Sequence, residues 1–207
     1  MLSTSRQAVA GSSRAGPAAA AARPVAHLNA RISAYLVDSA VLLGFILVFF
    51  VIAGAILLFA SDLGKEDAPD SAYYAFIATF LGGCLLSWTA FNLALLRWRG
   101  QTLGMYIVGI RTLGEDGLPL STGRTLLHWF ALHPVLFHPL LLPVWAVFSM
   151  LVVSLTLSKV VLVATLALVL LCLIAPAVSL ALMLLDAERR TLPDRLARTF
   201  VVHLDQP

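Results

Sequence analysis

Long apolar stretches that contain very few charged residues constrain this chain more than any other feature. The first covers residues 32–60, with Asp38 as its only charge, and the second covers residues 72–96. At about 1.5 Å per helical residue, each can cross a hydrocarbon layer roughly 30 Å thick. Of 207 residues, 60% are hydrophobic and 12% are charged. A soluble fold of this size cannot bury so much apolar surface, so we expect an integral membrane protein.

A third apolar region extends over residues 126–185, where Lys159 and the histidines are the only interruptions by ionisable groups. This region is too long for one span and suits a helical hairpin, with spans at residues 135–155 and 160–185. Prolines remove backbone donors and bend helices, although membrane helices tolerate them. Three prolines therefore leave the start of the third span open: Pro134, Pro139 and Pro143. The sequence predicts about four transmembrane helices, with three spans as the alternative.

Residues 97–134 are predicted to form a cytoplasmic segment. Residues 106–113 have the pattern of a strand, and the glycine-rich residues 114–117 have that of a turn. The expected fold class is therefore an all-α membrane protein with a short cytoplasmic β-hairpin. Ser121 or Thr122 is expected to cap a following helix, which is either interfacial or part of the third span.

One membrane domain is expected at residues 26–204, ending in a strand-like segment at residues 199–204. Residues 1–25 have no periodic apolar pattern and are expected to be a disordered tail. This tail lacks acidic residues, which is typical of transit peptides, but an Ala- and Arg-rich bacterial tail has the same composition and is favoured. Its arginines are Arg6, Arg14 and Arg23.

The basic residues indicate an orientation. Four of the fourteen Lys and Arg lie at the N-terminal end, four in the central segment and four in the C-terminal tail, whereas Lys65 and Lys159 occupy the other two loops. Cytoplasmic loops carry the excess of basic residues. We therefore expect a multi-pass protein of the bacterial cytoplasmic (inner) membrane with both termini in the cytoplasm. The basic residues form no patch with interleaved aromatics, so no nucleic-acid partner is expected.

Asp38 is the most informative polar residue, because a charge inside a span costs free energy unless it faces the bundle and has a partner. Arg31 lies on the same helical face but about 10 Å away along the axis, so the partner is sought on other helices. Asn92 and Arg97 are expected at a depth in the membrane similar to that of Asp38. Asn92 is a candidate hydrogen-bond partner of Asp38, and Arg97 is a candidate ion-pair partner. Asp186 joins this polar cluster. The alternative is that Asp38 only fixes helix packing.

Other chemical motifs are weak. His128, His133 and His138 recur every five residues, which places them on different helical faces, although a proline break would let them converge. Cys84 and Cys172 have no metal-ligand spacing and are interpreted as core residues. The sequence has no nucleotide fingerprint, P-loop or nucleophile–base pattern. We expect no enzymatic activity, no cofactor and no metal.

Three segments resemble the RDD family of membrane proteins: residues 30–38, residues 100–124 and residues 186–199. The resemblance implies that the Arg and the two Asp for which the family is named are Arg31, Asp38 and Asp194. The central segment carries a glycine motif, made up of Gly100, Gln101, Gly104 and Arg111.

The chain departs from the family pattern at several positions. Met105-Tyr106 stands where a basic residue is usual, Pro193 precedes Asp194 in place of His, and Arg198 replaces a glycine. Some members of the family are linked to cation/proton exchange and others to membrane-protein assembly.

Two functions follow as expectations. One is a structural, adaptor or assembly-related protein of the inner membrane, which contacts the lipid bilayer and either a second copy or other membrane proteins. The other is a proton-coupled monovalent cation transporter that uses Asp38. A transporter needs polar groups near the midplane and an outward route. The outer half of the expected bundle lacks ionisable residues. For a monomer, the sequence therefore favours the structural, adaptor or assembly-related role.

Overall fold

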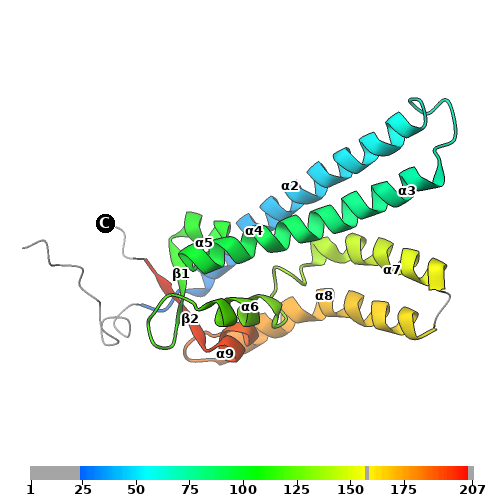
Figure 1. The fold of residues 1–207 in the computed structure, drawn as a ribbon. Coiled ribbons are helices and arrows are strands. Elements are labelled where there is room, and N and C mark those ends of the chain that lie inside the picture. Colours follow the sequence, from blue (N-terminus) through cyan, green and yellow to red (C-terminus); the bar gives the residue numbers. More distant parts are fainter. Residues whose placement is uncertain (1–23, 157–158, 205–207) are drawn as a thin grey trace, which may run out of the picture.

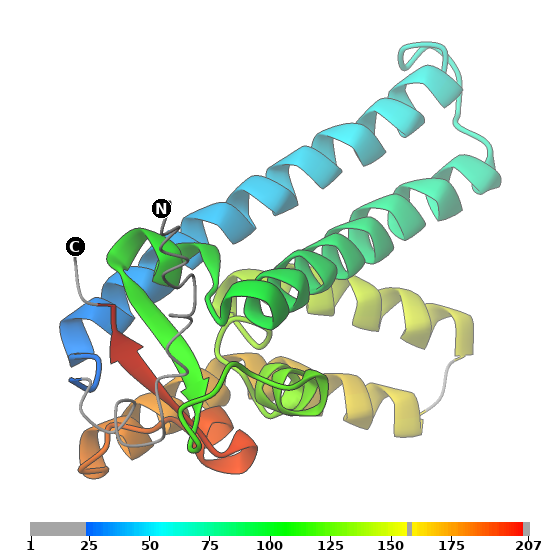
Figure 2. The ribbon, with the colours of Figure 1, turned by 60° about the vertical axis from the view of Figure 1, so that its left-hand side comes forward.

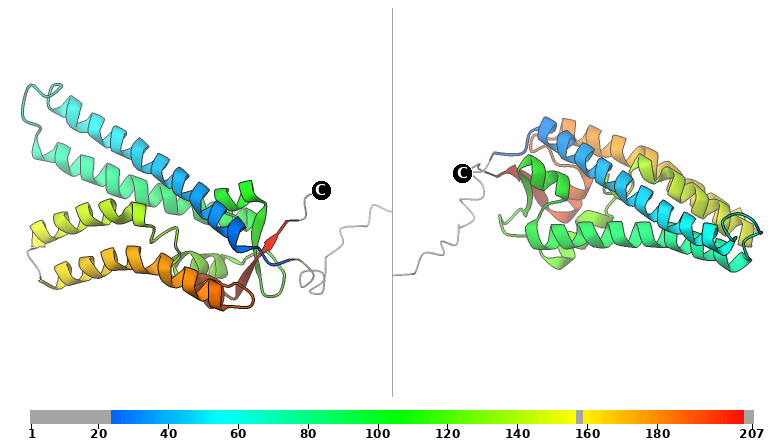
Figure 3. Two further views of the ribbon diagram at one scale, coloured as in Figure 1. Left: turned by 180° about the vertical axis from the view of Figure 1, so that it is seen from behind. Right: turned by 90° about the horizontal axis from the view of Figure 1, so that it is seen from above.

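Two antiparallel helical hairpins extend in the same direction from one end of the protein, where short helices and a small sheet gather (Figures 1 and 3). The computed structural model describes residues 24–156 and 159–204. The tail predicted to be disordered lies almost entirely outside these residues. The end that holds the sheet is called the sheet end below.

The first hairpin pairs α2 (Leu28–Ala60) with a returning helix that is continuous from Asp70 to Arg99. The returning helix consists of α3 (Asp70–Ile77), the π-helical η1 (Ala78–Gly83) and α4 (Cys84–Arg99). Aromatic side chains fill its interface with α2; the rings of Phe45 and Trp88, for example, meet edge-on at 5.5 Å. The first two predicted spans are confirmed as helices of membrane-spanning length.

The second hairpin consists of α7 (Leu142–Thr156) and α8 (Lys159–Leu185). The predicted third span at residues 135–155 is wrong at its start. Residues 131–138 form turns, with Leu132 at a φ of +52°, and the 3-10 turn η2 (Pro139–Leu141) precedes α7. Because prolines lack an N–H, Pro134 and Pro139 do not continue a helix here.

Three helices in the described part of the chain are long and apolar enough to cross a bilayer: Leu28–Ala60, Asp70–Arg99 and Leu162–Leu185. The apolar helix at Pro139–Met150 is shorter. The protein is thus a mostly helical membrane protein, and α7 is the helix that decides between three spans and four.

The helix α6 (Thr122–Phe130) is separate from α7 and lies at the sheet end. Of the two predicted caps, Ser121 and Thr122, Ser121 is the N-cap, and its hydroxyl accepts from the N–H of Arg124 at 3.4 Å. One face of α6 buries His128 and Trp129, whereas large apolar side chains on the other face are exposed. These are Leu126, Leu127 and Phe130.

The sheet has two antiparallel strands, β1 (Ile110–Gly114) and β2 (Thr199–His203) (Figure 2). A small sheet was predicted, but the expected hairpin within the central segment is wrong. The turn after β1 does form, since the N–H of Gly117 donates to the carbonyl of Gly114 at 2.8 Å. The chain then leaves for α6, and the C-terminal tail supplies the second strand. Residues 103–108, partly predicted as strand, form the helix α5 (Leu103–Val108).

The two strands belong to a repeated structural unit. Each unit has a six-residue helix, one residue at positive φ and a five-residue strand: α5, Gly109 and β1 in the first, and α9 (Leu192–Ala197), Arg198 and β2 in the second. Both helices begin after an N-cap threonine followed by leucine. Each unit also follows a helical hairpin.

The strand register relates the two units by a local two-fold symmetry. Thr112 and Val201, the third residues of their strands, face each other at the centre of the ladder. Equivalent backbone bonds close both ends. The N–H of Glu115 donates to the carbonyl of Arg198 at 3.1 Å, and the N–H of Leu204 donates to that of Gly109 at 2.8 Å. The chain therefore consists of two halves with the same order of elements, linked by α6.

Candidate functional site

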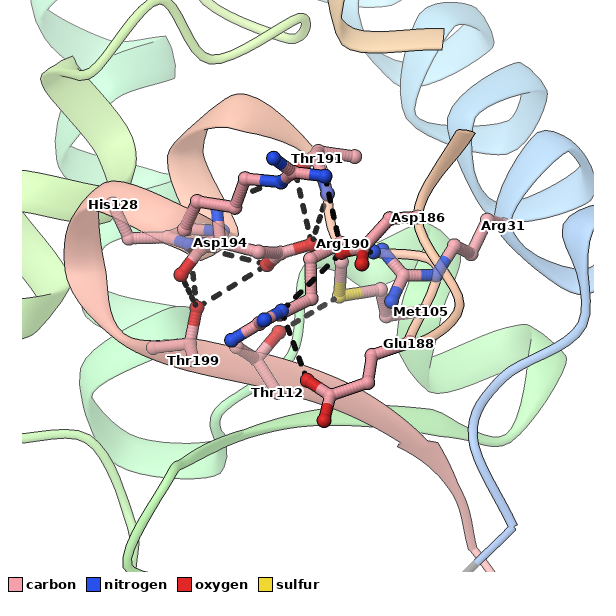
Figure 4. Close-up of polar contacts among 11 residues, drawn as sticks. Arg31, Met105, Thr112, His128, Asp186, Glu188, Arg190, Thr191, Asp194 and Thr199 are labelled. Carbon is pink, nitrogen blue, oxygen red and sulfur yellow. Dashed lines mark hydrogen bonds and ion pairs between the residues drawn. The ribbon is translucent and has the colours of Figure 1, made fainter. Parts of the chain in front are cut away.

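An ion pair joins the start of α2 to the C-terminal tail. Nη1 of Arg31 donates to Oδ2 of Asp194 at 2.9 Å, and their side chains are only 9% and 1% exposed. Figure 4 shows Arg31 reaching from α2 toward the tail. Breaking one partner of a buried pair leaves an uncompensated charge, so this contact fixes the tail against α2.

Asp194 also binds groups from three further elements. Its Oδ2 accepts from the N–H and the hydroxyl of Thr191, at 3.0 and 2.8 Å, which completes a capping box at the start of α9. Its Oδ1 accepts from the hydroxyl of Thr199 at 3.2 Å and lies 3.6 Å from Nδ1 of His128 (Figure 4). The carboxylate thereby connects α2, α6, α9 and β2.

The electrostatics of this cluster follow from burial and from Arg31. Burial alone raises the pKa of Asp194, but the charges of Arg31 and His128 and the hydrogen bonds from Arg31 and Thr191 outweigh it, so the pKa lies below its usual value. Burial lowers the pKa of His128, and Arg31 adds to this effect while Asp194 opposes it. The pKa values of both groups are therefore lowered, that of Asp194 by its partners and that of His128 by burial.

Asp38 joins α2 to α5. Its Oδ2 accepts from the hydroxyl of Thr102 at 2.6 Å, and its Oδ1 accepts from the N–H of Gly104 at 2.8 Å. Thr102 is the N-cap of α5, and its hydroxyl oxygen accepts from the N–H of Met105. A side chain at Gly104 would collide with the carbonyl oxygen of Ala34. Glycine there allows α5 to approach the backbone of α2 closely.

The predicted partners of Asp38 were wrong. In the described residues, the side-chain N–H of Asn92 donates to the carbonyl of Trp88 in its own helix at 3.0 Å. Arg97 donates to the hydroxyl of Thr122 at 3.1 Å, toward α6. The error has a physical reason: depth in the bilayer places residues at one level but does not say which face of the neighbouring helix they occupy.

The two aspartates have the same structural role in the two repeated units. Each binds the hydroxyl of an N-cap threonine and one backbone N–H at the start of a six-residue helix. Asp194 belongs to the helix that it caps, whereas Asp38 comes from α2, because the position in α5 equivalent to Asp194 is Met105. Carboxylates are favourable at helix N-termini, where free N–H groups gather.

The remaining predicted residues support these units. Gly100 ends α4 at a φ of +67°, and its carbonyl accepts from the N–H of Thr112 at 2.7 Å. Gln101 donates to the carbonyl of Ile110 at 2.8 Å, and Arg111 lies on β1. Asp186 ends α8 and forms ion pairs with Arg190 and Arg195, at 3.3 and 3.5 Å, apart from Arg31 and Asp38.

A cavity of about 470 Å³ brings the motif residues together, since Arg31, Asp38 and Asp194 all line it. Its walls come from α2, α5, α8, α9 and the turns before α7, and they are mostly apolar. His128 and His133 also line it, with their rings 5.1 Å apart, whereas His138 stacks on Tyr35 and lies 2.6 Å from the hydroxyl of Ser39. Within residues 24–156 and 159–204, no three His, Cys, Asp or Glu side chains form a metal-ligand group.

Several residues of this site were not identified from the sequence. The hydroxyl of Thr102 binds Asp38, and those of Thr191 and Thr199 bind Asp194. Thr102, Thr191 and Ser179 also line the cavity. The sequence does contain one sign of the two threonine caps, because a Thr-Leu pair precedes both Gly104 and Pro193. A threonine before a short apolar turn is typical of an N-cap.

One comparison with known proteins identifies the family of this chain. The family model of the RDD family matches residues 25–198, which cover the helical hairpins, both short units up to the start of β2 and all three motif residues. No curated protein and no solved structure shows a significant match to the chain. Since the match extends over most of the sequence, the chain belongs to the RDD family.

Proposed function

We propose that this protein is a four-span protein of the bacterial inner membrane with the sheet end in the cytoplasm. The repeated architecture supports four spans, because α7 precedes α8 as α2 precedes the helix that ends with α4. With η2, α7 extends over residues 139–156, and at about 1.5 Å per residue that length crosses most of a hydrocarbon layer roughly 30 Å thick.

The positions of the basic residues support this orientation. Lys65 lies in the loop between α2 and α3, and Lys159 begins α8, so both are far from the sheet end. The arginines of the central segment and of the tail lie at the sheet end. Cytoplasmic loops carry the excess of basic residues, and this distribution supports a cytoplasmic location for the sheet end and α6.

Within that membrane we propose a structural, adaptor or assembly-related role without enzymatic activity. The main observation in favour of this role is that the charged side chains of the motif form their bonds within the protein itself. Arg31, Asp38 and Asp194 each bond to another element of the chain. Residues 39–60, 71–96, 142–156 and 160–185 contain no Asp, Glu, Lys, Arg or His. The helices therefore offer no ionisable relay to the other membrane face.

A second candidate is a proton-coupled monovalent cation transporter, which the cavity favours. Asp38 and Asp194 both line it, and ionisable residues in membrane proteins commonly mark ion and proton pathways. An oligomer would have to supply the outward half of the path.

Proton flux in liposomes separates the two roles. The purified protein is reconstituted with an internal pH indicator and exposed to Na⁺ or K⁺ gradients. The structural role predicts no flux above that of protein-free liposomes. The variants are Asp38→Asn and, as the matched control, Asp116→Asn, whose carboxylate pairs with Arg124 on the surface. Flux that Asp38→Asn abolishes and Asp116→Asn preserves would overturn the structural role and establish transport.

A further inference from the structure

The cavity beside Arg31 has the size and position of a lipid site. Its volume of about 470 Å³ falls within the range of roughly 300–1,000 Å³ that is common for small-molecule sites. Ile32, Leu36 and Leu180 line it and are 41%, 62% and 42% exposed. They belong to α2 and α8, two helices long and apolar enough to span the bilayer. The cavity is therefore bordered by apolar side chains that face hydrocarbon near the sheet end.

Three residues of the wall carry buried polar atoms that have no hydrogen-bond partner within the described chain. They are Nε and Nη2 of Arg31, Nε2 of His128 and Oγ of Ser179. Buried polar atoms without partners are unfavourable, so their gathering around one cavity points to a polar ligand. The N–H groups of Arg31 require that this ligand supply hydrogen-bond acceptors.

The free edge of Arg31 indicates which acceptor fits. Asp194 bonds to Nη1 and leaves the Nε–Nη2 edge unused. The two N–H groups of that edge are parallel and match two oxygens of a phosphate or carboxylate group. Membrane phospholipids provide such a phosphate at the depth of the first turns of a span, where Arg31 lies.

The surrounding charges limit the charge of the ligand. Asp194 already neutralises Arg31, and Asp38 lines the same cavity. A doubly charged phosphate monoester would be repelled by these carboxyl groups, whereas a phosphodiester carries one negative charge. The C-terminal tail adds arginines at this end, which attract anionic head groups. They are Arg189, Arg190, Arg195 and Arg198.

We propose that this cavity binds a phospholipid, whose phosphodiester group accepts hydrogen bonds from the Nε–Nη2 edge of Arg31 and whose acyl chains leave between α2 and α8. The site is independent of whether the protein acts as an adaptor or as a transporter. Bound lipid would supply partners for the buried polar atoms and connect the two hairpins.

Native mass spectrometry of the full-length protein tests the site. Delipidated protein in detergent is titrated with phosphatidylglycerol, and the retained lipid is counted. Arg31→Lys keeps a positive charge beside Asp194 but lacks the forked edge, so we expect binding about tenfold weaker, the loss of one charged hydrogen bond. Arg97→Lys is the matched control, because Arg97 bonds to Thr122 away from the cavity, and it should bind as the wild type does.

Two further probes define the ligand. Phosphatidic acid, a monoester, should bind more weakly than phosphatidylglycerol, and soluble glycerophosphoglycerol should not compete at equal concentration because it lacks acyl chains. Tighter binding of phosphatidic acid, or competition by the soluble head group, would overturn the proposal. So would unchanged retention in Arg31→Lys.

A cavity-filling variant covers the case in which Arg31→Lys does not fold. Ser179→Leu adds volume at a buried lining position of α8 and leaves Arg31 and Asp194 in place. Loss of lipid binding in a monodisperse Ser179→Leu protein supports the site, and wild-type retention contradicts it.

Discussion

Arg31 and Asp194 lie 163 positions apart in the sequence, yet their side chains form a buried ion pair of 2.9 Å between α2 and α9. Asp38, two turns further along α2, performs the equivalent task for α5. The start of α2 thus holds both repeated units, which in turn pair through β1 and β2. The motif residues therefore organise the sheet end, and the following predictions test that role.

Removing one member of the Arg31–Asp194 pair should be strongly destabilising. We expect Asp194→Asn to lose about 3–5 kcal/mol, because Arg31 stays buried without its counter-charge. Unfolding in detergent, followed by tryptophan fluorescence, measures the change. Asp116→Asn breaks an exposed pair with Arg124 and should cost at most about 1 kcal/mol.

A double-mutant cycle checks that the effect comes from the pair. Arg31→Met combined with Asp194→Asn should lose less stability than the sum of the two single changes, because the buried charge is then gone. Additive losses would show that the two residues act separately.

The close approach of α5 to α2 should make Gly104 intolerant of any side chain. We expect Gly104→Ala to lower the unfolding free energy by about 1–3 kcal/mol, since the added methyl group collides with the backbone of Ala34. Gly123, in α6, has open space around its Cβ position, so Gly123→Ala should leave stability unchanged or raise it by up to about 1 kcal/mol. Equal effects of the two changes would contradict the packing.

The buried histidines should make the protein less stable in mild acid. Burial lowers the pKa of His128 and lowers that of His133 well below its usual value. The two rings face each other, Asp194 opposes the lowering of both pKa values, and Arg31 adds to the lowering for His128. The unfolded chain therefore binds more protons than the folded one below about pH 6.5, the ordinary histidine pKa. Stability is complete above that pH and falls as the pH decreases toward the folded pKa values.

Melting temperatures at pH 7.5 and pH 5.5 measure this dependence. The decrease between the two should be smaller in His128→Gln than in the wild type. A slope that does not change in His128→Gln would assign the acid sensitivity to other groups.

The repeat predicts that Arg198 occupies a position that favours glycine. Its φ of +52° corresponds to that of Gly109, +76°, in the first unit. A left-handed conformation costs a residue with a Cβ roughly 1–2 kcal/mol, so Arg198→Gly should raise the unfolding free energy by about 1 kcal/mol. Arg198→Ala keeps the Cβ and should give no such gain, which separates the backbone effect from the loss of charge.

The sequence by itself determined the membrane class, the first two spans, the long helix α8, a helix cap at Ser121 or Thr122 and the strand character of residues 199–203. These features depend on local composition: apolar length decides whether a segment can span a bilayer, and a capping side chain bonds to its own helix. The family resemblance also singled out Arg31, Asp38 and Asp194, and all three line one cavity in the structure.

Only the tertiary structure decided the partners of those residues. Asp38 bonds to Thr102 and Gly104 instead of Asn92, and β1 pairs with β2 instead of a neighbour in its own segment. Hydrogen-bond partners across long sequence separations depend on helix rotation and strand register, which no local pattern encodes. For the same reason the two-fold relation between the repeated units became visible only when their strands were paired.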